Sequence, residues 1–385
     1  ISDFCEEETI ATPRHAGPIV LFSNIAVVAL LILLPGIGVH GAHAAIFTVN
    51  NNGDGHDASP GTGTCADAGG SCTLRAAIEE VNAHAADGHT INFAIGTGTV
   101  TITPATALPA VMRDGTYISG ATQPGYAGTP IVEINGQNAG ITTDGIVLAG
   151  SGQYLVSLVV NRFSYHGVSI TGNNNRVLNC YIGIGVNGTS DLGNGGVGLS
   201  ITSSNNTIGG NGASVRNVIS GNSSSGVAIQ GAGASNNTLQ GNYIGTDAAG
   251  TLAIPNGFNG VLIIDGATGN DVGYGPSGWG NLISGNTSAG VRISGVGTSS
   301  NSVQSNLIGT NASGTAALAN ASGVEIGDGA ANNSVGGDAA LERNVLSGNT
   351  YDGVIIQGSG TSSNSATGNY IGTNVSGTAA LANGR

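Results

Sequence analysis

Carboxylates are scarce in this chain, so their positions decide which chemistry the sequence could support. Hydrolysis of a polysaccharide needs two or three carboxylates that converge across a groove. Cleavage by elimination needs a strong base, commonly Arg or Lys, beside acidic ligands for Ca²⁺. Within the repeated part of the sequence, Asp265 and Asp328 are related by the repeat, and each precedes a glycine. We interpret both as turn residues rather than as an ion site.

Other charged side chains are no better placed for catalysis. Asp271 follows Asp265 by six residues in the same predicted insertion, so a carboxylate pair there is a weak hypothesis. No histidine follows His166, which removes the usual general base from the later repeats. We expect Arg216 and Arg343, which precede equivalent Asn-Val pairs, to form surface salt bridges rather than catalytic contacts. The calcium-binding repeat Gly-Gly-x-Gly-x-Asp is absent, so we expect no cofactor, and Ca²⁺ has no motif to support it.

Three aromatic residues are the candidates for ligand binding. Tyr274 and Trp279, the only tryptophan of the chain, lie in one insertion, and Phe258 lies in the preceding one. Aromatic faces can stack on sugars, and exposed loops often carry function. The alternative, which we favour, is that Trp279 folds over a corner and seals an apolar edge.

These residues belong to a sequence that repeats. The Ile-Gly anchors at Ile182, Ile244, Ile308 and Ile371 are 62, 64 and 63 residues apart. A fixed period of this length indicates a solenoid. A shorter phrase of the type Gly-Val-x-Ile recurs more often, so each long unit contains two coils. It starts at Gly145, Gly167, Gly198, Gly226, Gly260, Gly290, Gly323 and Gly353.

Each coil should combine short strands with tight corners. The phrase alternates with period two, which places its Val and Ile inside, stacked on their equivalents in the next coil. Corners need positive φ, which Gly allows freely and Asn tolerates. We expect the corner Asn side chains to hydrogen-bond along the axis. Residues beyond a bare coil form insertions, which should emerge alternately from two corners.

Composition excludes several classes of partner. Charged residues make up 8% of the chain, the net charge is −13, and all nine basic residues are arginines. An acidic chain without basic patches argues against nucleic acid and anionic membranes. The regular Val and Ile positions argue against disorder, although the chain contains 68 glycines.

The N-terminal segment has the pattern of an export signal. The apolar run Ile19–Leu34 is followed by small residues at 42–44, which predicts cleavage after Ala44. A membrane span is the rival interpretation, but the run is short for one. The chain starts without Met and stops at Arg385 inside a repeat, so we expect sequence upstream and further coils downstream.

The region after the signal should close the end of the solenoid. Cys65 and Cys72 are seven residues apart, which predicts a small disulfide loop in an exported protein. Cys180 should occupy a buried coil position. Thr73 is a plausible N-cap for a helix over Leu74–Ala85. Its apolar face, which we expect to cover the first coil, consists of Leu74, Ala77, Ile78 and Val81, and we place Arg75, Glu79 and Glu80 away from that face.

The segment Cys72-Thr-Leu-Arg-Ala-Ala77 resembles the N-terminal motif of CSLREA-domain proteins. It departs from that motif at Thr73 and Ala76, where the family has Ser and Glu. The similarity covers roughly residues 46–385, through Ile78, Asn82-Ala83, Thr90–Phe93, Ile118–Pro130, Ile131–Ile134 and the Asn-Tyr-Ile-Gly-Thr repeats. The resemblance implies an exported bacterial right-handed parallel β-helix, often part of a longer surface protein. It supplies no catalytic residue to carry over.

We therefore predict an all-β, right-handed parallel β-helix with a short N-terminal capping helix. Residues 1–44 form an upstream segment and signal peptide, 45–144 the cap and opening coils, and 145–385 the regular coils. The first functional hypothesis is a secreted or cell-surface, adhesin-like protein without catalytic activity. The alternative is a secreted polysaccharide lyase or glycoside hydrolase, since parallel β-helices host pectin-degrading enzymes.

A third hypothesis is a carbohydrate-binding module centred on Tyr274 and Trp279. The partner in each case is an extracellular polysaccharide or surface glycan. Three acids, or acids with an arginine, in one groove would favour the enzyme. An exposed Trp279 beside a cleft would favour binding.

Overall fold

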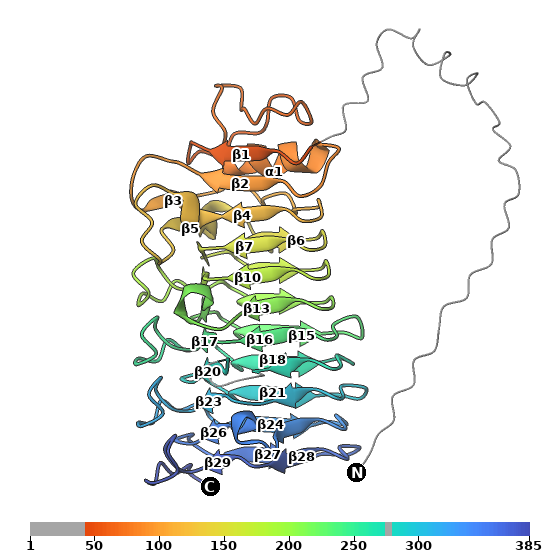
Figure 1. Cartoon of the computed structure of the whole chain (residues 1–385), viewed down its shortest axis with the longest axis vertical. Coiled ribbons are helices and arrows are strands. Elements are labelled where there is room, and N and C mark those ends of the chain that lie inside the picture. Colours follow the sequence, from red (N-terminus) through yellow and green to blue (C-terminus); the bar gives the residue numbers. More distant parts are fainter. Residues whose placement is uncertain (1–42, 274–278) are drawn as a thin grey trace, which may run out of the picture. The chain divides into compact units, whose positions relative to one another are not determined.

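The computed structural model describes residues 43–273 and 279–385. Residues 1–42, which include the predicted signal segment, and residues 274–278, which include Tyr274, lie outside the described residues. Within the described part, short strands stack in three parallel sheets, and the chain passes from sheet C to sheet A to sheet B in each regular coil (Figure 1). This is a right-handed parallel β-helix, as predicted, with the handedness that parallel crossovers favour.

The strand bounds follow the order of each sheet. Sheet A contains β1 (Ile46–Val49), β2 (Thr90–Phe93), β4 (Tyr117–Ser119), β7 (Tyr154–Val156), β10 (Arg176–Leu178), β13 (Thr207–Gly209), β16 (Thr238–Gln240), β19 (Asp271–Val272), β22 (Ser302–Val303), β25 (Ser334–Gly336) and β28 (Ser365–Thr367). Sheet B contains β3 (Val100–Ile102), β5 (Val132–Asn135), β8 (Leu158–Asn161), β11 (Tyr181–Ile182), β14 (Val218–Ile219), β17 (Tyr243–Ile244), β20 (Leu282–Ile283), β23 (Leu307–Ile308), β26 (Val345–Leu346) and β29 (Tyr370–Ile371). Sheet C contains β6 (Ile146–Leu148), β9 (Val168–Ile170), β12 (Leu199–Ile201), β15 (Val227–Gln230), β18 (Val261–Ile264), β21 (Val291–Ser294), β24 (Val324–Gly327) and β27 (Val354–Ile356).

The helical elements are short and lie outside the sheets. They are α1 (Leu74–Ala83) and the 3₁₀ turns η1 (Gly120–Thr122), η2 (Gly136–Asn138), η3 (Ala213–Val215) and η4 (Ala340–Glu342). No helix of the described residues is long and apolar enough to cross a lipid bilayer.

The interior of the helix is a stack of aliphatic side chains in register. Val227 pairs with Val261, and Val261 pairs with Val291, and all three side chains are fully buried. The eight Gly-Val-x-Ile phrases form the eight strands of sheet C, so the predicted alternation is confirmed. Cys180 is a free, buried thiol, and burial raises its pKa to about 12.

Asparagine ladders run along three corners. In each ladder one Nδ2 donates to the Oδ1 of the next coil, which confirms the predicted axial bonding. For example, the Oδ1 of Asn242 accepts from the Nδ2 of Asn217, and the Nδ2 of Asn242 donates to the Oδ1 of Asn281. Both donor–acceptor distances are 2.9 Å. The ladders consist of Asn206, Asn237, Asn270, Asn301, Asn333 and Asn364; of Asn217, Asn242, Asn281, Asn306, Asn344 and Asn369; and of Asn194, Asn222, Asn256, Asn286, Asn320, Asn349 and Asn383.

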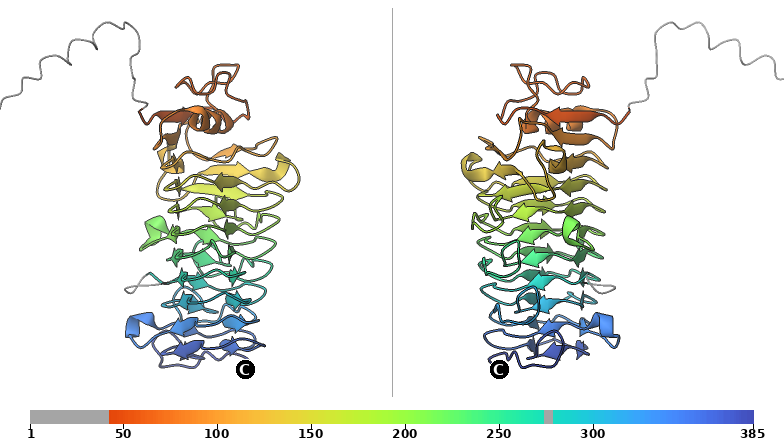
Figure 2. Two further views of the ribbon diagram at one scale, coloured as in Figure 1. Left: turned by 90° about the vertical axis from the view of Figure 1, so that its right-hand side faces the viewer. Right: turned by 60° about the vertical axis from the view of Figure 1, so that its left-hand side comes forward.

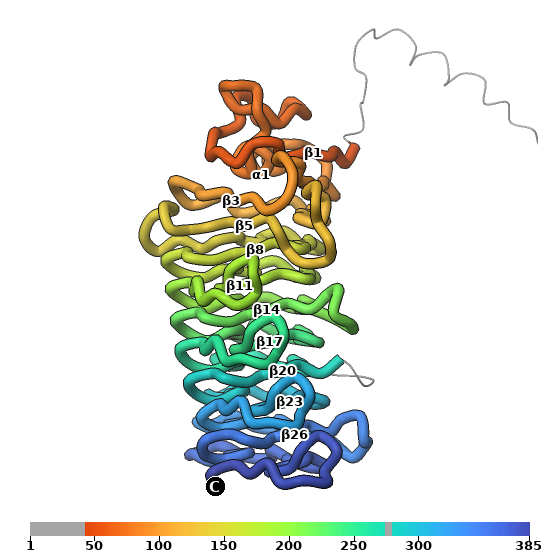
Figure 3. Tube along the Cα trace, turned by 90° about the vertical axis from the view of Figure 1, so that its left-hand side faces the viewer, coloured from red at the N-terminus to blue at the C-terminus, as the bar shows by residue number. Residues whose placement is uncertain are grey.

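Insertions leave the coils alternately at the two ends of sheet B, as predicted. Those between sheets A and B contain η3 and η4. Those between sheets B and C follow β11, β17, β23 and β29, and each closes with a short antiparallel bridge, such as Thr246 with Ala253. Figure 3 shows sheet B with these loops lying over and beside it.

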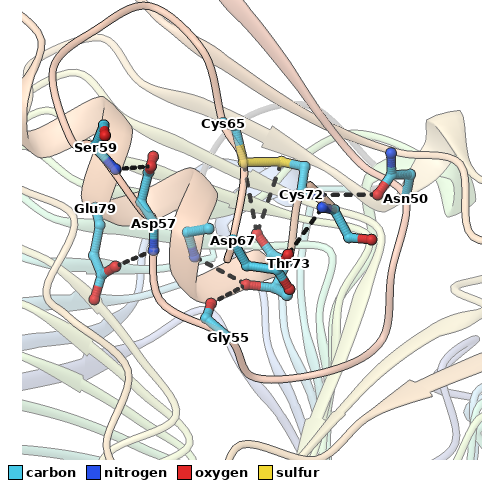
Figure 4. Close-up of a disulfide and its surroundings, with 11 residues drawn as sticks. Asn50, Gly55, Asp57, Ser59, Cys65, Asp67, Cys72, Thr73 and Glu79 are labelled. Atoms are coloured by element: carbon cyan, nitrogen blue, oxygen red, sulfur yellow. Dashed lines mark hydrogen bonds between the residues drawn. A yellow bond between two sulfur atoms is a disulfide. The ribbon is translucent and has the colours of Figure 1, made fainter. Parts of the chain in front are cut away.

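The N-terminal cap, which we define as residues 46–93, covers the first coil (Figure 2). The Thr73 hydroxyl accepts from the Ala76 N–H and so caps α1, and Leu74, Ala77, Ile78 and Val81 are fully buried. Cys65 and Cys72 form a disulfide beside this N-terminus (Figure 4). The helix ends at Ala83, two residues before the predicted end, because His84 adopts extended backbone angles.

One prediction about α1 was wrong. Arg75 and Glu80 were placed away from the buried face, but both are buried. The loop from Asp54 to Gly63 folds over this side of the helix, and its backbone N–H groups and Asp54 bind these two charges.

Candidate functional site

The three sheets differ in how much of their outer face remains open. On sheet B, the hairpin insertions cover part of the outer face of the sheet. Tyr181 and Val218 are therefore buried and pack against Ile184 and Ile254. On sheet C, the outward side chains Ser169, Ser200 and Ala228 are small and buried, and they interrupt a row that continues through the half-buried Leu262, Arg292, Glu325 and Ile355. Sheet A keeps a continuous row of partly or fully exposed side chains.

We call this row and its borders the sheet A face. One outward side chain per coil follows the next in strict register, so the row spans about 38 Å at about 4.8 Å per coil. The row consists of Tyr117, Tyr154, Arg176, Thr207, Thr238, Asp271, Ser302, Ser334 and Ser365. Hydroxyl groups therefore dominate the middle and the C-terminal end of the face.

The N-terminal end of the sheet A face is aromatic and cationic. The ring centroids of Tyr117 and Tyr154 are 5.4 Å apart, and the Arg176 guanidinium carbon lies 5.6 Å from the Tyr154 centroid. Stacked rings beside a cation offer a flat platform with hydrogen-bond donors at its edge.

Two hollows lie at equivalent places along the face; both floors carry hydroxyl side chains, but the first contains Arg176, whereas the second contains Asp338 and Glu342. The first has a volume of about 420 Å³ and lies between sheet A and the insertion of η3; its lining includes Thr207, Thr238, Gln240, Asn211 and Val215. The second has a volume of about 520 Å³ and lies against the insertion of η4; its lining includes Ser334, Ser365, Thr367, Asp338 and Glu342. Thr207 and Ser334 are 127 residues apart, so the same hollow recurs after two long units.

Trp279 stands at the equivalent corner position between these hollows. The carbonyl of Trp279 accepts from the Gly241 N–H, as the carbonyl of Val215 accepts from Asn179 and that of Glu342 accepts from Ser305. Val215 and Glu342 line the two hollows, which places Trp279 at the border of the sheet A face. Trp279 is neither fully buried nor fully exposed.

Asp271 lies in the middle part of the row, next to Thr238. It lies in β19 rather than in an insertion, because the neighbouring Asn270 belongs to a corner ladder that fixes the start of the strand. Burial raises its pKa, while a hydrogen bond from the Ser302 hydroxyl acts in the opposite direction. Asp265 instead turns the preceding corner with φ of 59°, so the two carboxylates do not share an insertion.

The sequence-predicted aromatic residues lie at different corners. Phe258, 58% exposed, stands where sheet B leads into sheet C, and its N–H and C=O bond Ser224 and Ser288 of the adjacent coils. Trp279 stands where sheet A leads into sheet B. Sheet B separates these two corners, so the structure does not bring Phe258 and Trp279 together. Tyr274 lies outside the described residues.

Acids do meet an arginine on sheet C. Arg292 contacts Glu325 at 3.3 Å and Asp328 at 2.9 Å, beside a hollow of about 230 Å³. This meets the criterion set above for an enzyme, but the guanidinium is ion-paired with both carboxylates. Hydrogen bonds from Ser294 and Arg292 lower the pKa of Asp328. We interpret the cluster as a surface ion pair at a turn, where Asp328 has φ of 53°.

The expected salt bridges of Arg216 and Arg343 are not formed with any described carboxylate. Each guanidinium instead stacks on a tyrosine of the next coil, at 3.9 Å from the Tyr243 centroid and 4.1 Å from the Tyr370 centroid. The prediction was wrong because the partner comes from the neighbouring coil, which repeat spacing alone does not identify.

No metal centre is apparent in residues 43–273 and 279–385, where no three His, Cys, Asp or Glu side chains gather closely enough to hold an ion. The histidines of the cap have other contacts. His89 accepts from the Ala45 N–H at Nδ1, and its Nε2 lies 2.8 Å from the Ala86 carbonyl. His56 lies 2.6 Å from Glu79.

Comparison with known proteins finds likeness in structure only. No protein-family model matches the chain, so its resemblance to CSLREA-domain proteins stays a prediction. No curated protein matches it either. Pectate lyase Pel9A superposes with a TM-score of 0.46 and 14% identity, over 88% of this chain and 82% of the lyase.

Two further solved structures show a weaker likeness. The A-module of mannuronan C-5 epimerase AlgE6 from Azotobacter vinelandii gives a TM-score of 0.43 and 16% identity, over 84% of this chain and 98% of the module. A PL6 alginate lyase in complex with a trisaccharide gives a TM-score of 0.36 and 12% identity, over 80% of this chain and 60% of the lyase. The assignment of the β-helix rests on the strand ladders rather than on these scores.

Proposed function

We propose that the protein is an exported, surface-associated β-helix that binds an extended glycan along the sheet A face. The observation that carries this proposal is the recurrence of one polar hollow after two long units, with Trp279 at the border between the two copies. A polymer of repeating units can contact both hollows through the hydroxyl groups that their floors share. Sheet B is covered by its hairpins, and the outward row of sheet C is interrupted by the buried Ser169, Ser200 and Ala228.

The chemistry of the face suits sugars. Hydroxyls of Thr207, Thr238 and Ser334 and the amide of Gln240 can exchange hydrogen bonds with sugar hydroxyls. Aromatic rings at Tyr117 and Trp279 supply apolar surface for the faces of sugar rings. The hollows are open and shallow, which fits a chain that lies along the surface rather than a ligand enclosed in a cavity.

The test is glycan-array binding by the purified chain and three variants. We expect Trp279→Ala to lose at least tenfold in affinity for the glycans that bind. Phe258→Ala is the matched control, because it removes an exposed aromatic ring from the other corner and should bind as the parent does. The third variant, Thr207→Val with Thr238→Val, changes the floor of the first hollow and nothing at the corner. Equal binding by all variants would contradict the proposal.

A polysaccharide-cleaving enzyme is the second candidate, favoured by Asp271. This carboxyl group is half-buried in the middle part of the face, and a raised pKa suits a general acid. Purified protein should then release reducing ends or unsaturated products from polygalacturonate or alginate, with or without Ca²⁺. Asp271→Asn should abolish that turnover and leave binding intact. If no polymer that binds yields a product, the enzymatic candidate is rejected and only the binding role remains.

A further inference from the structure

A separate hollow lies on the outer side of sheet B, between the η3 insertion and the hairpin that follows β17. We call it the Arg216 pocket. It has a volume of about 380 Å³, and its lining includes Asn179, Tyr181, Ser214, Arg216, Val218 and Ala248. None of its lining residues belongs to the row of the sheet A face, so it is a distinct place on the molecule.

Arg216 is the only charged side chain in the lining of this pocket. Its Nε donates to the Gly241 carbonyl at a distance of 3.2 Å. Its guanidinium carbon lies 3.9 Å from the centroid of the Tyr243 ring. Those two contacts fix the plane of the guanidinium. Among the described residues its terminal nitrogens have no hydrogen-bond partner, and no carboxylate lies within ion-pairing distance.

The stacked pair is not needed to build a coil. Arg343 and Tyr370 repeat it two long units later, with Nε donating to the Gly368 carbonyl over 2.9 Å. In the intervening unit Gly280 and Leu307 stand in their places, and the coil keeps the same strand pairing. Tyr181, the equivalent of Tyr243 one long unit earlier, also has no arginine in the preceding coil, where Ser157 stands at that position.

The copy at Arg343 differs at two positions that matter for binding. Leu307 stands where the Arg216 pocket has Tyr181, and Val375 stands where it has Ala248. A tyrosine hydroxyl and the space above a small side chain are therefore specific to the Arg216 pocket. Arg343 offers the same stacking without this lining.

We propose that the Arg216 pocket binds an oxyanion carried on a sugar, a carboxylate or a sulfate ester, through the two terminal nitrogens of Arg216. A planar guanidinium whose terminal nitrogens have no partner among the described residues can bind such groups bidentately. The volume of the pocket accommodates about one sugar residue, and the ring of Tyr181 offers a wall for it. In a chain of net charge −13, a pocket lined by an arginine and by no carboxylate is suited to an anion.

Calorimetric titration of the full chain tests the proposal. The probes are a uronate oligosaccharide, a sulfated oligosaccharide and a neutral oligosaccharide of equal length. We expect one or both acidic probes to bind at least tenfold more tightly than the neutral one, and more weakly as salt rises. Comparison of the two acidic probes identifies the oxyanion. Binding of neither, or equal binding of all three, would overturn the proposal.

The variants separate this pocket from general stability and from the sheet A face. Arg216→Gln should abolish the preference for acidic probes, and Arg216→Lys should restore part of it. Arg343→Gln removes the same stacking elsewhere and should leave binding unchanged, so it controls for effects on the fold. Trp279→Ala should leave the acidic preference intact even if it abolishes binding along sheet A. An Arg216→Gln protein that keeps the preference would refute the assignment.

Discussion

The N-terminal cap and the regular coils hold their polar groups with different interactions. In the cap, buried charges bind loops: Arg75 forms two 2.9 Å hydrogen bonds to Asp54, and Glu80 accepts the N–H groups of Gly61 and Gly63. In the coils, neutral asparagines bind their equivalents one coil away. A repeated coil can satisfy its neighbour with the same residue, whereas the end of the stack has no neighbour and needs dissimilar partners.

Of the substitutions that test this comparison, we expect Arg75→Ala to have the largest effect on stability. Arg75→Ala should lower the free energy of unfolding by about 3–5 kcal/mol, because it leaves the Asp54 carboxylate, only 16% exposed, without its partner. Chemical unfolding measures the difference. The control is Arg292→Ala in the coils, a more exposed ion pair whose loss should cost less than about 1 kcal/mol. Equal losses at both sites would show that the cap does not depend on buried charge.

Breaking one ladder should have the next largest effect. Asn242→Ala removes the acceptor of the Asn217 side chain and the donor to the Ile208 carbonyl, and all of these groups are buried. Orphaned buried groups cost about 1–3 kcal/mol each, so we expect a loss of about 3 kcal/mol on chemical unfolding. Asn211→Ala changes an exposed asparagine and should have little effect. A neutral Asn242→Ala variant would contradict the role given to the ladders.

Removal of the disulfide tests the cap more gently. Cys65 and Cys72 are separated by seven residues, and so short a loop constrains the unfolded chain only modestly. Replacement of both by Ser should lower stability by about 2 kcal/mol, measured against the parent under non-reducing conditions. Limited proteolysis should then find new cleavage in residues 54–71 and none in the coils. Cleavage spread over the coils would show that the cap stabilises the whole stack.

Acid should loosen the cap slightly through His89. Burial lowers the pKa of this side chain below its usual 6.5, so the unfolded state takes up the proton more readily than the folded state does. Stability is therefore complete above about pH 6.5 and falls as pH decreases toward the folded pKa. Thermal unfolding between pH 7 and pH 5 should show this slope. His89→Gln should flatten it; an unchanged slope would assign the effect to other groups.

The structure of the coils could be predicted from the sequence because the coils repeat. The cap has no repeat, so less of its structure could be predicted. The Gly-Val-x-Ile phrases located every strand of sheet C, and Asn at the corners predicted the ladders. The capping helix was also predicted, because Thr73 and an apolar face of period 3.6 are local signals. The burial of Arg75 and Glu80 was missed, since their partners lie about twenty residues earlier in a loop without regular structure.

The candidate site was harder to predict for a related reason. Side chains on the sheet A face come from different coils, about thirty residues apart, and alternation alone does not say which outer face stays open. Asp271 was placed in an insertion because its strand is only two residues long. Two signals were present in the sequence. Asn270 lies at a corner and marks the start of a strand. Trp279 lies two residues before a ladder asparagine, as Val215 and Glu342 do.

Hydrogen–deuterium exchange with a bound glycan from the array tests the central claim most directly. We expect slower exchange in peptides of the sheet A face, above all 207–215, 238–241 and 302–305, and unchanged exchange in the sheet C strand Val261–Ile264. Protection confined to sheets B or C, with sheet A unchanged, would contradict the account.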